Sequence, residues 1–594
     1  MLRSHAATGN RAAAPPRPGF TAHELWLLAI LLALYLLLPA MPGVVNWPRP
    51  YDAGENWFYA NLSRDFDNYW FPCLPVLLAT LKYHLPQWLM APAQKLVFLP
   101  LVALSFSAGA LIHSRRAGSL AAGLSALLLY FTAVRGGVQY EQFIEQVLQA
   151  ATLLALLCAF AAEFNSELVK QGLCAVAFTA AVWAKGIVAP LLPVFIVLQA
   201  RAQRSFKKAL RRYWLLLAIP AAVTLVWSLL NLFYRCEFTV LEGPARAGSN
   251  IAMGALGFIS TVEGDWRGAA GIGTGENAFF WAVAQVAAHP LRFLQGIAGR
   301  LYFLLVTEPL LPGMWVFFLF GALGAFRLRK LPRARPMALV TGYILGIYLL
   351  MPVEGRYFLP FWCLLCCLSA IVLADLIKKE DAAAEWGAGR AAFIAAAAPL
   401  LALWGFSFLL LVTFPVRAGF ALTGHEARIP SPWVQTMLAE RAMEEGDFDS
   451  ALARYHEAYD LENISWRRAR YAKAAFRKGS VRARSLERYI QNPGWDYDVM
   501  FLAGLKYLEE GEVKKGGELL SAAMKACVPY RDMMRSVSTP EEAVFASRLE
   551  ARGREVCAGE IKSFTAALSD RRRNKIGALL PRACLDCVWH PAGL

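Results

Sequence analysis

The chain has 594 residues, of which 57% are hydrophobic and 18% are charged, and its formal net charge is +16. This composition is more apolar than that of ordinary soluble enzymes, and it therefore excludes that class of protein. The basic residues gather in short clusters between apolar runs, at 115–116, 201–212, 327–335 and 378–379. Short basic loops of this kind mark the cytoplasmic side of a membrane protein, so we expect a lipid bilayer rather than nucleic acid as the partner.

Apolar runs long enough to cross a bilayer, which takes roughly 20 helical residues, recur through the chain and predict about 10 to 13 spans. The first run, 25–41, is followed by MPGVVNWPRP, which offers no small-residue cleavage site, and so we expect it to be retained. A span at 291–311 would upset the alternation of loops, so that segment is expected to lie along the interface. The other predicted spans are 96–112, 119–134, 147–162, 172–183, 187–200, 213–232, 314–326, 337–351, 357–377 and 391–414.

The basic clusters orient the chain with its N-terminus, which carries Arg3 and Arg11, on the cytoplasmic side. The predicted outer segments are the loops 42–90, 135–142 and 233–290 and the turns 185–186 and 353–357. We expect an all-α protein of three parts. They are a cytoplasmic tail (1–23), a transmembrane domain (24–415) and an extracytoplasmic helical domain (416–594).

The last part of the chain is charged and has no run of membrane length. Residues 442–458 read as a helix, a Gly-Asp-Phe turn and a second helix with Ala-Leu-x-x-Tyr-x-x-Ala spacing, which resembles a tetratricopeptide repeat. Weaker echoes follow at 471–488 and 502–526, and a generic helical bundle is the alternative. An even number of cysteines lies here, so disulfides are expected among Cys527, Cys557, Cys584 and Cys587. The remaining cysteines are expected in the apolar core.

The first outer loop contains the stretch DAGENWFYAN, residues 52–61, in which Asp52 and Glu55 stand among aromatic residues that include Tyr59. A solvated loop or a helix lying on the membrane surface would also account for this stretch. Two further motifs follow on the same predicted side, AAVWAKGIVAP at 180–190 and GRYFLP at 355–360.

Taken in this order, the three motifs resemble integral-membrane glycosyltransferases of the GT-C superfamily, in the branch of the protein O-mannosyltransferases and lipid A aminoarabinose transferases. The resemblance covers roughly residues 20–415 and leaves out the tail. Position 55 is Glu where the family usually has Asp, and Phe71 stands where the aminoarabinose transferases place a lysine. These departures leave open whether Glu55 or Asp52 matches the family's acid.

The resemblance implies transfer of a glycosyl group from a polyprenyl-phosphate sugar to an acceptor at the outer face of a bacterial inner membrane. Glu55 or Asp52 would act as base, and Arg356 and Lys185 would stabilise the lipid phosphate. Glu141, which shares a helix face with Glu145, would orient the acceptor or help to hold a divalent cation. Glu145, Tyr59 and Tyr357 are the remaining substrate-binding candidates. Structural roles are the alternatives, with Lys185 reaching from a helix end to solvent, Arg356 capping a turn and Glu141 starting a helix.

Several assignments stay open. No cofactor is certain, and a divalent cation remains an option. The acceptor is a protein, lipid A or a polysaccharide, and the tail is expected to dock the acceptor or a partner protein. The Gly-rich segment 264–277 lacks a P-loop's Lys-Ser/Thr ending and is interpreted as a gate. The competing functions are a transporter or flippase, and a membrane-anchored repeat scaffold.

Overall fold

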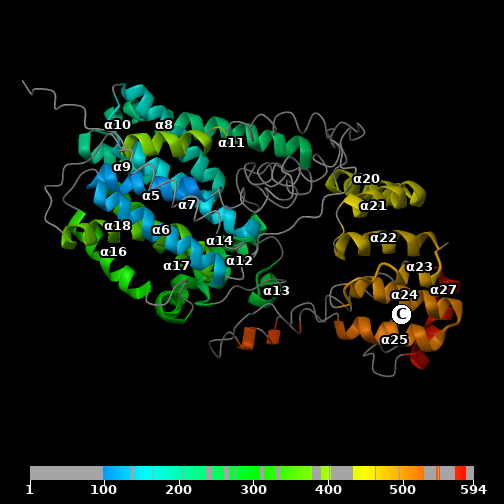
Figure 1. Cartoon of the computed structure of the whole chain (residues 1–594). Coiled ribbons are helices and arrows are strands. Elements are labelled where there is room, and N and C mark those ends of the chain that lie inside the picture. The colour runs from blue at the N-terminus through cyan, green and yellow to red at the C-terminus, as the bar shows by residue number, and fades with distance from the viewer. Residues whose placement is uncertain are drawn as a thin grey trace, which may run out of the picture.

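The computed structural model describes the chain mainly between Phe98 and Ala583 (Figure 1). The predicted span 25–41 and the opening loop with Asp52, Glu55 and Tyr59 lie outside the described residues, as do the four cysteines of the tail. The described ranges are 98–135, 140–164, 166–203, 205–235, 244–259, 266–273, 276–307, 314–328, 335–377, 389–400, 402, 432–461, 463, 465–479, 481–493, 496–526, 543–545, 547–548, 551 and 569–583.

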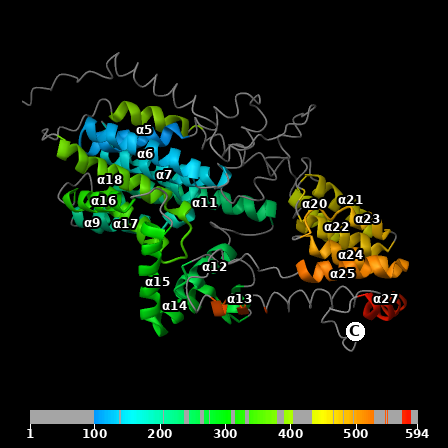
Figure 2. The same cartoon turned by 60° about the horizontal axis from the view of Figure 1, so that its bottom comes forward.

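Within these ranges the secondary structure is helical and contains no strand, which confirms the predicted all-α class. The helices of the first part form a bundle (Figures 1 and 2). They are α5 (Leu99–Ile112), α6 (Arg115–Arg135), α7 (Tyr140–Ala161), α8 (Glu167–Ala184), α9 (Leu191–Gln203), α10 (Phe206–Arg212), α11 (Trp214–Arg235), α16 (Met314–Leu328), α17 (Arg335–Leu349) and α18 (Leu359–Ile377). Three short turns of other helical type are η1 (Gly186–Val188), η2 (Phe303–Thr307) and η3 (Gly355–Phe358).

Three of the described helices are long and apolar enough to cross a membrane, at Ile144–Ala161, Glu167–Ala184 and Gly355–Ile377. Seven further apolar helices in the described ranges are shorter than this criterion requires. The structure therefore supports membrane-spanning helices at three of the predicted positions. The full count of spans and their orientation stay predictions.

Small residues let the bundle helices approach closely. A Cβ atom on Gly109 of α5 would lie 2.8 Å from the backbone of Ala117, and one on Gly118 of α6 would lie 2.6 Å from the carbonyl oxygen of Phe106. The pair α5 and α6 can pack at this distance only because both positions are glycine. Glycines at helix contacts are typical of membrane bundles, where van der Waals packing replaces the hydrophobic effect.

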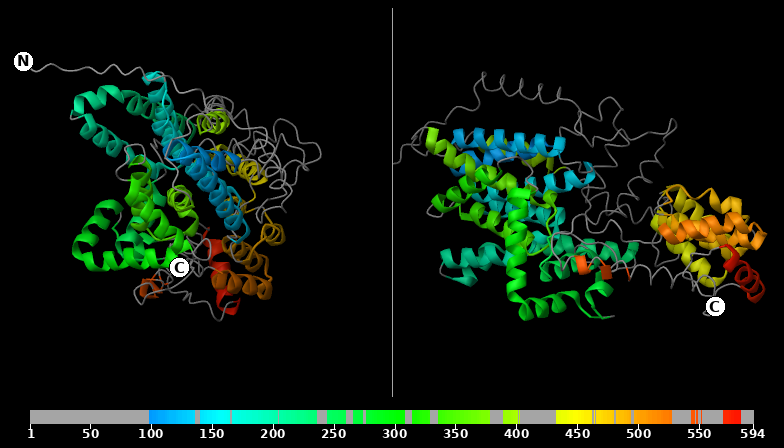
Figure 3. Two further views of the ribbon diagram at one scale, coloured as in Figure 1. Left: turned by 60° about the vertical axis from the view of Figure 1, so that its left-hand side comes forward. Right: turned by 90° about the horizontal axis from the view of Figure 1, so that it is seen from below.

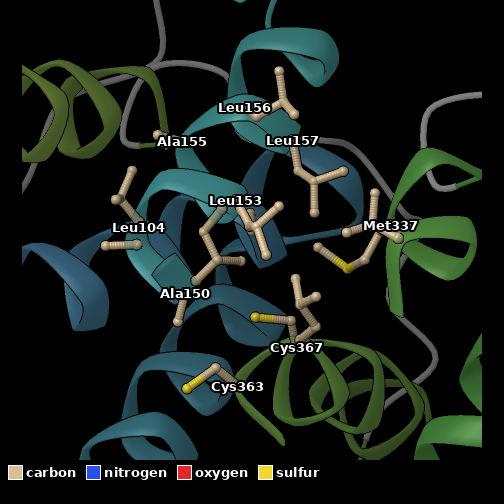
Figure 4. Packing of buried hydrophobic residues seen from close by; sticks show 14 of the residues in the cluster. Leu104, Ala150, Leu153, Ala155, Leu156, Leu157, Met337, Cys363 and Cys367 are labelled. Atoms are coloured by element: carbon tan, nitrogen blue, oxygen red, sulfur yellow. The ribbon is translucent and has the colours of Figure 1, made fainter. Parts of the chain in front are cut away.

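The core of the bundle is built around α7 and α18. Figure 4 shows Leu153 and Leu157 of α7 packed with Leu104 of α5, Met337 of α17 and Cys367 of α18. Five cysteines of the described residues are buried and unbridged, as expected for core positions: Cys158, Cys174, Cys363, Cys366 and Cys367.

The long loop predicted at 233–290 folds into its own helices, α12 (Pro244–Ala255), α13 (Trp266–Ala270) and α14 (Ala278–Ala288), and α15 (Pro290–Tyr302) follows. In Figures 2 and 3, α15 runs crosswise to α5, α6 and α7. The predicted position of this segment along the membrane interface stays a prediction. Arg300 of α15 is fully buried and donates three hydrogen bonds of 2.7 Å each. The acceptors are the carbonyl oxygens of Gly254, Phe258 and Leu349, so one side chain ties α12 and α17 to α15.

The C-terminal helices form a second group apart from the bundle (Figures 1 and 3). They are α20 (Pro432–Glu445), α21 (Phe448–Leu461), α22 (Ser465–Lys478), α23 (Ala483–Glu487), α24 (Tyr497–Glu510), α25 (Val513–Ala526) and α27 (Asp570–Ala583). Gly446, Gly479 and Gly511 follow α20, α22 and α24 with φ of 79°, 79° and 94°, a left-handed conformation that glycine adopts without steric cost. The helix–turn–helix units are thus present, and their assignment as tetratricopeptide repeats stays a prediction.

A segment near the C-terminus reaches the loop helices. The side chain of Phe545 is 5% exposed and packs edge to face on Phe258, with the ring centroids 5.0 Å apart. It shares a small apolar cluster with Met253 of α12 and Ile272. This cluster links the C-terminal part of the chain to the loop between α11 and α16.

Candidate active site

Two motifs of the same design place cations at the helix ends. In each, a glycine-containing turn is followed by a proline at the start of the next helix, at Pro190 and Pro360. Lys185 ends α8 in an extended conformation, with φ of −159° and ψ of 120°, and η1 follows it. Glu354 precedes η3, which carries Arg356, in a similar extended conformation. Proline suits the first turn of a helix because its missing N–H has no partner there, so both motifs break the helix and restart it.

Lys185 is buried between an acid and an aromatic ring. Its Nζ lies 3.1 Å from Oε1 of Glu145 and 4.2 Å from the centroid of the Tyr357 ring, and the residue is 8% exposed. The buried side chain therefore does not extend into solvent, which was the alternative interpretation of this lysine. A buried ammonium is stable only when it is paired and hydrogen-bonded, and Glu145 and the ring face supply that environment.

Arg356 approaches the same ring from the other turn. Its guanidinium carbon lies 5.1 Å from the centroid of the Tyr357 ring, and its Nη2 lies 2.5 Å from Oε2 of Glu354. The side chains of Arg356 and Glu354 are both about four-fifths buried, with exposures of 22% and 21%. Two cations and two carboxylates thus surround one tyrosine.

The tyrosine itself rests on the end of α17. The ring of Tyr357 stacks on that of Tyr348 with an interplanar angle of 7° and a centroid distance of 5.9 Å. The amide of Gln149 on α7 hydrogen-bonds the hydroxyl of Tyr348 at 3.3 Å, and Tyr343 donates to the carbonyl oxygen of Ile187 in η1 at 2.7 Å. These contacts lock α7, α17 and both turns into one arrangement.

Four of the predicted site residues, Glu145, Lys185, Arg356 and Tyr357, come together here from three separate stretches of the sequence. Glu141 lies in α7 one turn before Glu145, and its side chain is outside the described part of the structure. The proposed bases Asp52 and Glu55, and with them Tyr59, also lie outside it. The acid of the first loop therefore stays a prediction.

Sequence reasoning missed Glu354, Tyr348 and Gln149. Glu354 stands two residues before Arg356, and this spacing was the signal that could have found it. Tyr348 and Gln149 lie inside apolar helices, and their pairing depends on how α7 and α17 pack, which the sequence does not reveal.

The described residues contain no group of three or more His, Cys, Asp or Glu side chains arranged to hold a metal ion. Glu145 and Glu354 each face a cation instead. Lys185 and Arg356 thus provide two fixed cations near the helix ends, an arrangement that suits recognition of an anion such as a phosphate.

The described part of the Gly-rich segment is held by its own hydrogen bonds. Nη2 of Arg267 donates to the carbonyl oxygens of Gly273 at 3.1 Å and Glu276 at 2.5 Å, and the Gly273 N–H donates to Oε2 of Glu276 at 3.0 Å. This turn leads directly into α14. Its interpretation as a gate over the site stays a prediction.

Comparison with protein-family models finds no matching family, and the sequence matches none of the curated proteins.

Proposed function

We propose that the protein is an integral-membrane glycosyltransferase that takes a sugar from a polyprenyl phosphate and gives it to an acceptor at the membrane surface. The observation that carries this proposal is the convergence of Lys185 and Arg356 on Tyr357 from two separate interhelical turns. Both turns belong to motifs that resemble those of the GT-C superfamily.

The chemistry requires cations at this place. When the glycosidic bond to a lipid phosphate breaks, negative charge develops on the phosphate, and fixed cations in a site shielded from water stabilise it. Arg356 suits this task because a guanidinium matches the geometry of phosphate oxygens, and Lys185 adds a second point charge. Glu354 and Glu145 would hold the two cations in place and be displaced or shared when the phosphate binds.

The acceptor hydroxyl needs a base or an orienting carboxylate, and Glu55 or Asp52 of the first loop fills that role in the proposal. Glu141, at the start of α7 and one turn from Glu145, is a further acid on the same helix. The proposed donor face is outward, at a bacterial inner membrane, and the C-terminal helical domain is then periplasmic.

A transfer assay on the purified full-length protein tests this proposal. Radiolabelled polyprenyl-phosphate sugars serve as donors and envelope extract as acceptor, and wild type is compared with Glu55→Gln and Asp52→Asn. We expect label transfer by wild type and loss of transfer in one of the two variants. Transfer by both variants at the wild-type rate removes the first-loop base, and absence of transfer from every donor favours the transporter or scaffold alternatives.

A further inference from the structure

Gln146 follows Glu145 in the second turn of α7 and is 1% exposed. Neither Nε2 nor Oε1 of its side chain has a hydrogen-bond partner in the described structure. Gln149, one turn further along the same helix, is also buried, but its amide bonds the hydroxyl of Tyr348. A buried amide with both of its polar ends unpaired destabilises a fold. Stability therefore does not explain why a glutamine occupies this position, and another role is needed.

The position of Gln146 on the helix shows which elements it faces. Gln146 lies four residues before Ala150 and therefore on the same face of α7. Figure 4 shows Ala150 on the side of α7 that faces Cys363 and Cys367 of α18. Helical spacing thus places Gln146 on the α18 side of α7, one turn nearer than Ala150 to the end of α7 where Glu145 pairs with Lys185 of the α8 end.

A second unpaired polar group stands on α18. Trp362, next to Cys363, is fully buried, and its indole N–H has no hydrogen-bond partner among the described residues. Buried tryptophans usually find a partner for this N–H. Trp362 lies in the first turn of α18, directly after η3 with Arg356. Two unpaired groups are therefore present on two facing helices, near the same end of the bundle.

We infer that Gln146, with Trp362, binds a hydroxyl-bearing, uncharged part of a ligand, and that within the proposed function this part is the sugar of the lipid donor. A glutamine amide both donates and accepts, which matches a hydroxyl group, and it carries no charge that would favour a phosphate. Charged and uncharged parts of the donor are then bound by different residues. Lys185 and Arg356 serve the phosphate, and Gln146 and Trp362 recognise the sugar.

The first arm of the test needs no ligand. Gln146→Met and Gln149→Met make the same change one helical turn apart, and Met has nearly the shape of Gln. The thermal unfolding temperature of the purified full-length protein is measured for both. We expect Gln146→Met to leave it unchanged or raise it, and Gln149→Met to lower it because Tyr348 loses its partner. A decrease for Gln146→Met as large as that for Gln149→Met overturns the inference, because it shows that Gln146 already has a structural partner.

The second arm measures dissociation constants for undecaprenyl phosphate and for the same lipid carrying mannose, glucose or aminoarabinose. We expect wild type to bind one glycosylated lipid more tightly than the bare lipid, and Gln146→Met or Trp362→Phe to lose about 5- to 10-fold of that preference, as removal of a buried hydrogen bond predicts. Retention of the full preference by both variants overturns the inference and leaves the proposed function standing. Failure of wild type to bind any of these lipids overturns the proposed function and, with it, the sugar assignment.

Discussion

Lys185 and Tyr357 meet from two different interhelical turns, with the ammonium 4.2 Å from the ring centroid. The contact joins the end of α8 to η3, just before α18, and Arg356 lies near the same ring, with its guanidinium carbon 5.1 Å from the centroid. Glu145 and Glu354 balance the two charges in the observed arrangement, and in the proposed function the phosphate of the donor would displace or share these carboxylates.

The Lys185–Glu145 ion pair should behave as a buried pair. Lys185→Met leaves the carboxylate of Glu145 unpaired in a largely buried site, so we expect a loss of about 3–5 kcal/mol in the free energy of unfolding. Replacing both residues, as Lys185→Met with Glu145→Gln, removes the unpaired charge and should recover at least half of that loss. Unfolding in detergent, followed by temperature or denaturant, gives these values.

The matched control is an exposed ion pair. Arg441 and Glu445 stand one turn apart on α20 with side chains 67% and 61% exposed, so Arg441→Ala should cost no more than about 0.5 kcal/mol. Equal losses for Lys185→Met and Arg441→Ala would show that Lys185 is solvated and that the site is not assembled as described.

The candidate site shows which of its residues could be predicted from the sequence and which could not. Lys185 and Arg356 were predicted as partners of a phosphate because their motifs, AAVWAKGIVAP and GRYFLP, resemble those of the GT-C superfamily. That pattern is local and can be recognised from the sequence. The predicted Gly-Asp-Phe turn is also local, and its glycine, Gly446, has the left-handed conformation that favours glycine after a helix.

What the sequence does not reveal depends on packing between helices. Arg300 reads as one more basic residue in an amphipathic segment, yet it is fully buried and bonded to three carbonyl oxygens. Phe545 reads as an ordinary apolar residue of the tail, yet it packs on Phe258, which is far away in sequence. No periodicity or spacing in the sequence predicts either contact.

Arg300 should be required for the position of the loop helices. Arg300→Met leaves three buried carbonyl oxygens without their donor, at about 1–3 kcal/mol each, so we expect strong local destabilisation. Arg300→Lys keeps the charge, but an ammonium lacks the fixed fork of donors with which a guanidinium reaches three acceptors. This variant should therefore retain only part of the stability that Arg300→Met loses. Hydrogen exchange checks this at the Val353 N–H, which donates to the carbonyl oxygen of Ile259 at 2.8 Å. Unchanged exchange there in Arg300→Met would contradict the assigned role.

Phe545 should anchor the C-terminal segment to the loop helices. Phe545→Ala removes a nearly fully buried ring, and a change of this type in a core costs about 3–5 kcal/mol. Faster proteolysis near residue 545 is expected, together with faster hydrogen exchange around Phe258. The neighbouring Val544 is 54% exposed, so Val544→Ala is the matched control and should leave both rates as in wild type. If the two variants behave alike, the contact does not hold the segment.

The C-terminal helical domain should lose stability in acid through Glu509. Burial alone would raise the pKa of this carboxyl, but hydrogen bonds from Arg572 and Lys506 lower it below its ordinary value of 4.5. Because the pKa is lower in the folded state, Glu509 contributes stability that is fully present above the ordinary value and is lost as the pH falls through the folded pKa. We therefore expect the protection of α24 and α27 amides to decrease below about pH 4.5.

Glu509→Gln should remove that part of the acid sensitivity and lower the stability at neutral pH. Glu512 is exposed and gives the control, since Glu512→Gln should leave the acid profile unchanged. An unaltered profile in Glu509→Gln would show that the contact with α27 does not depend on this charge.

The central claim is that Arg356 and Lys185 stabilise the phosphate of a lipid-linked sugar donor. The most direct test compares the rates of label transfer by purified wild type, Arg356→Ala and Arg477→Ala. Arg477 is an exposed basic residue of α22, so its loss changes the net charge equally without touching the site. The account predicts transfer by wild type and Arg477→Ala, and a decrease of about 10²- to 10³-fold in Arg356→Ala, the range for loss of one transition-state donor. Transfer by Arg356→Ala at the wild-type rate would contradict it.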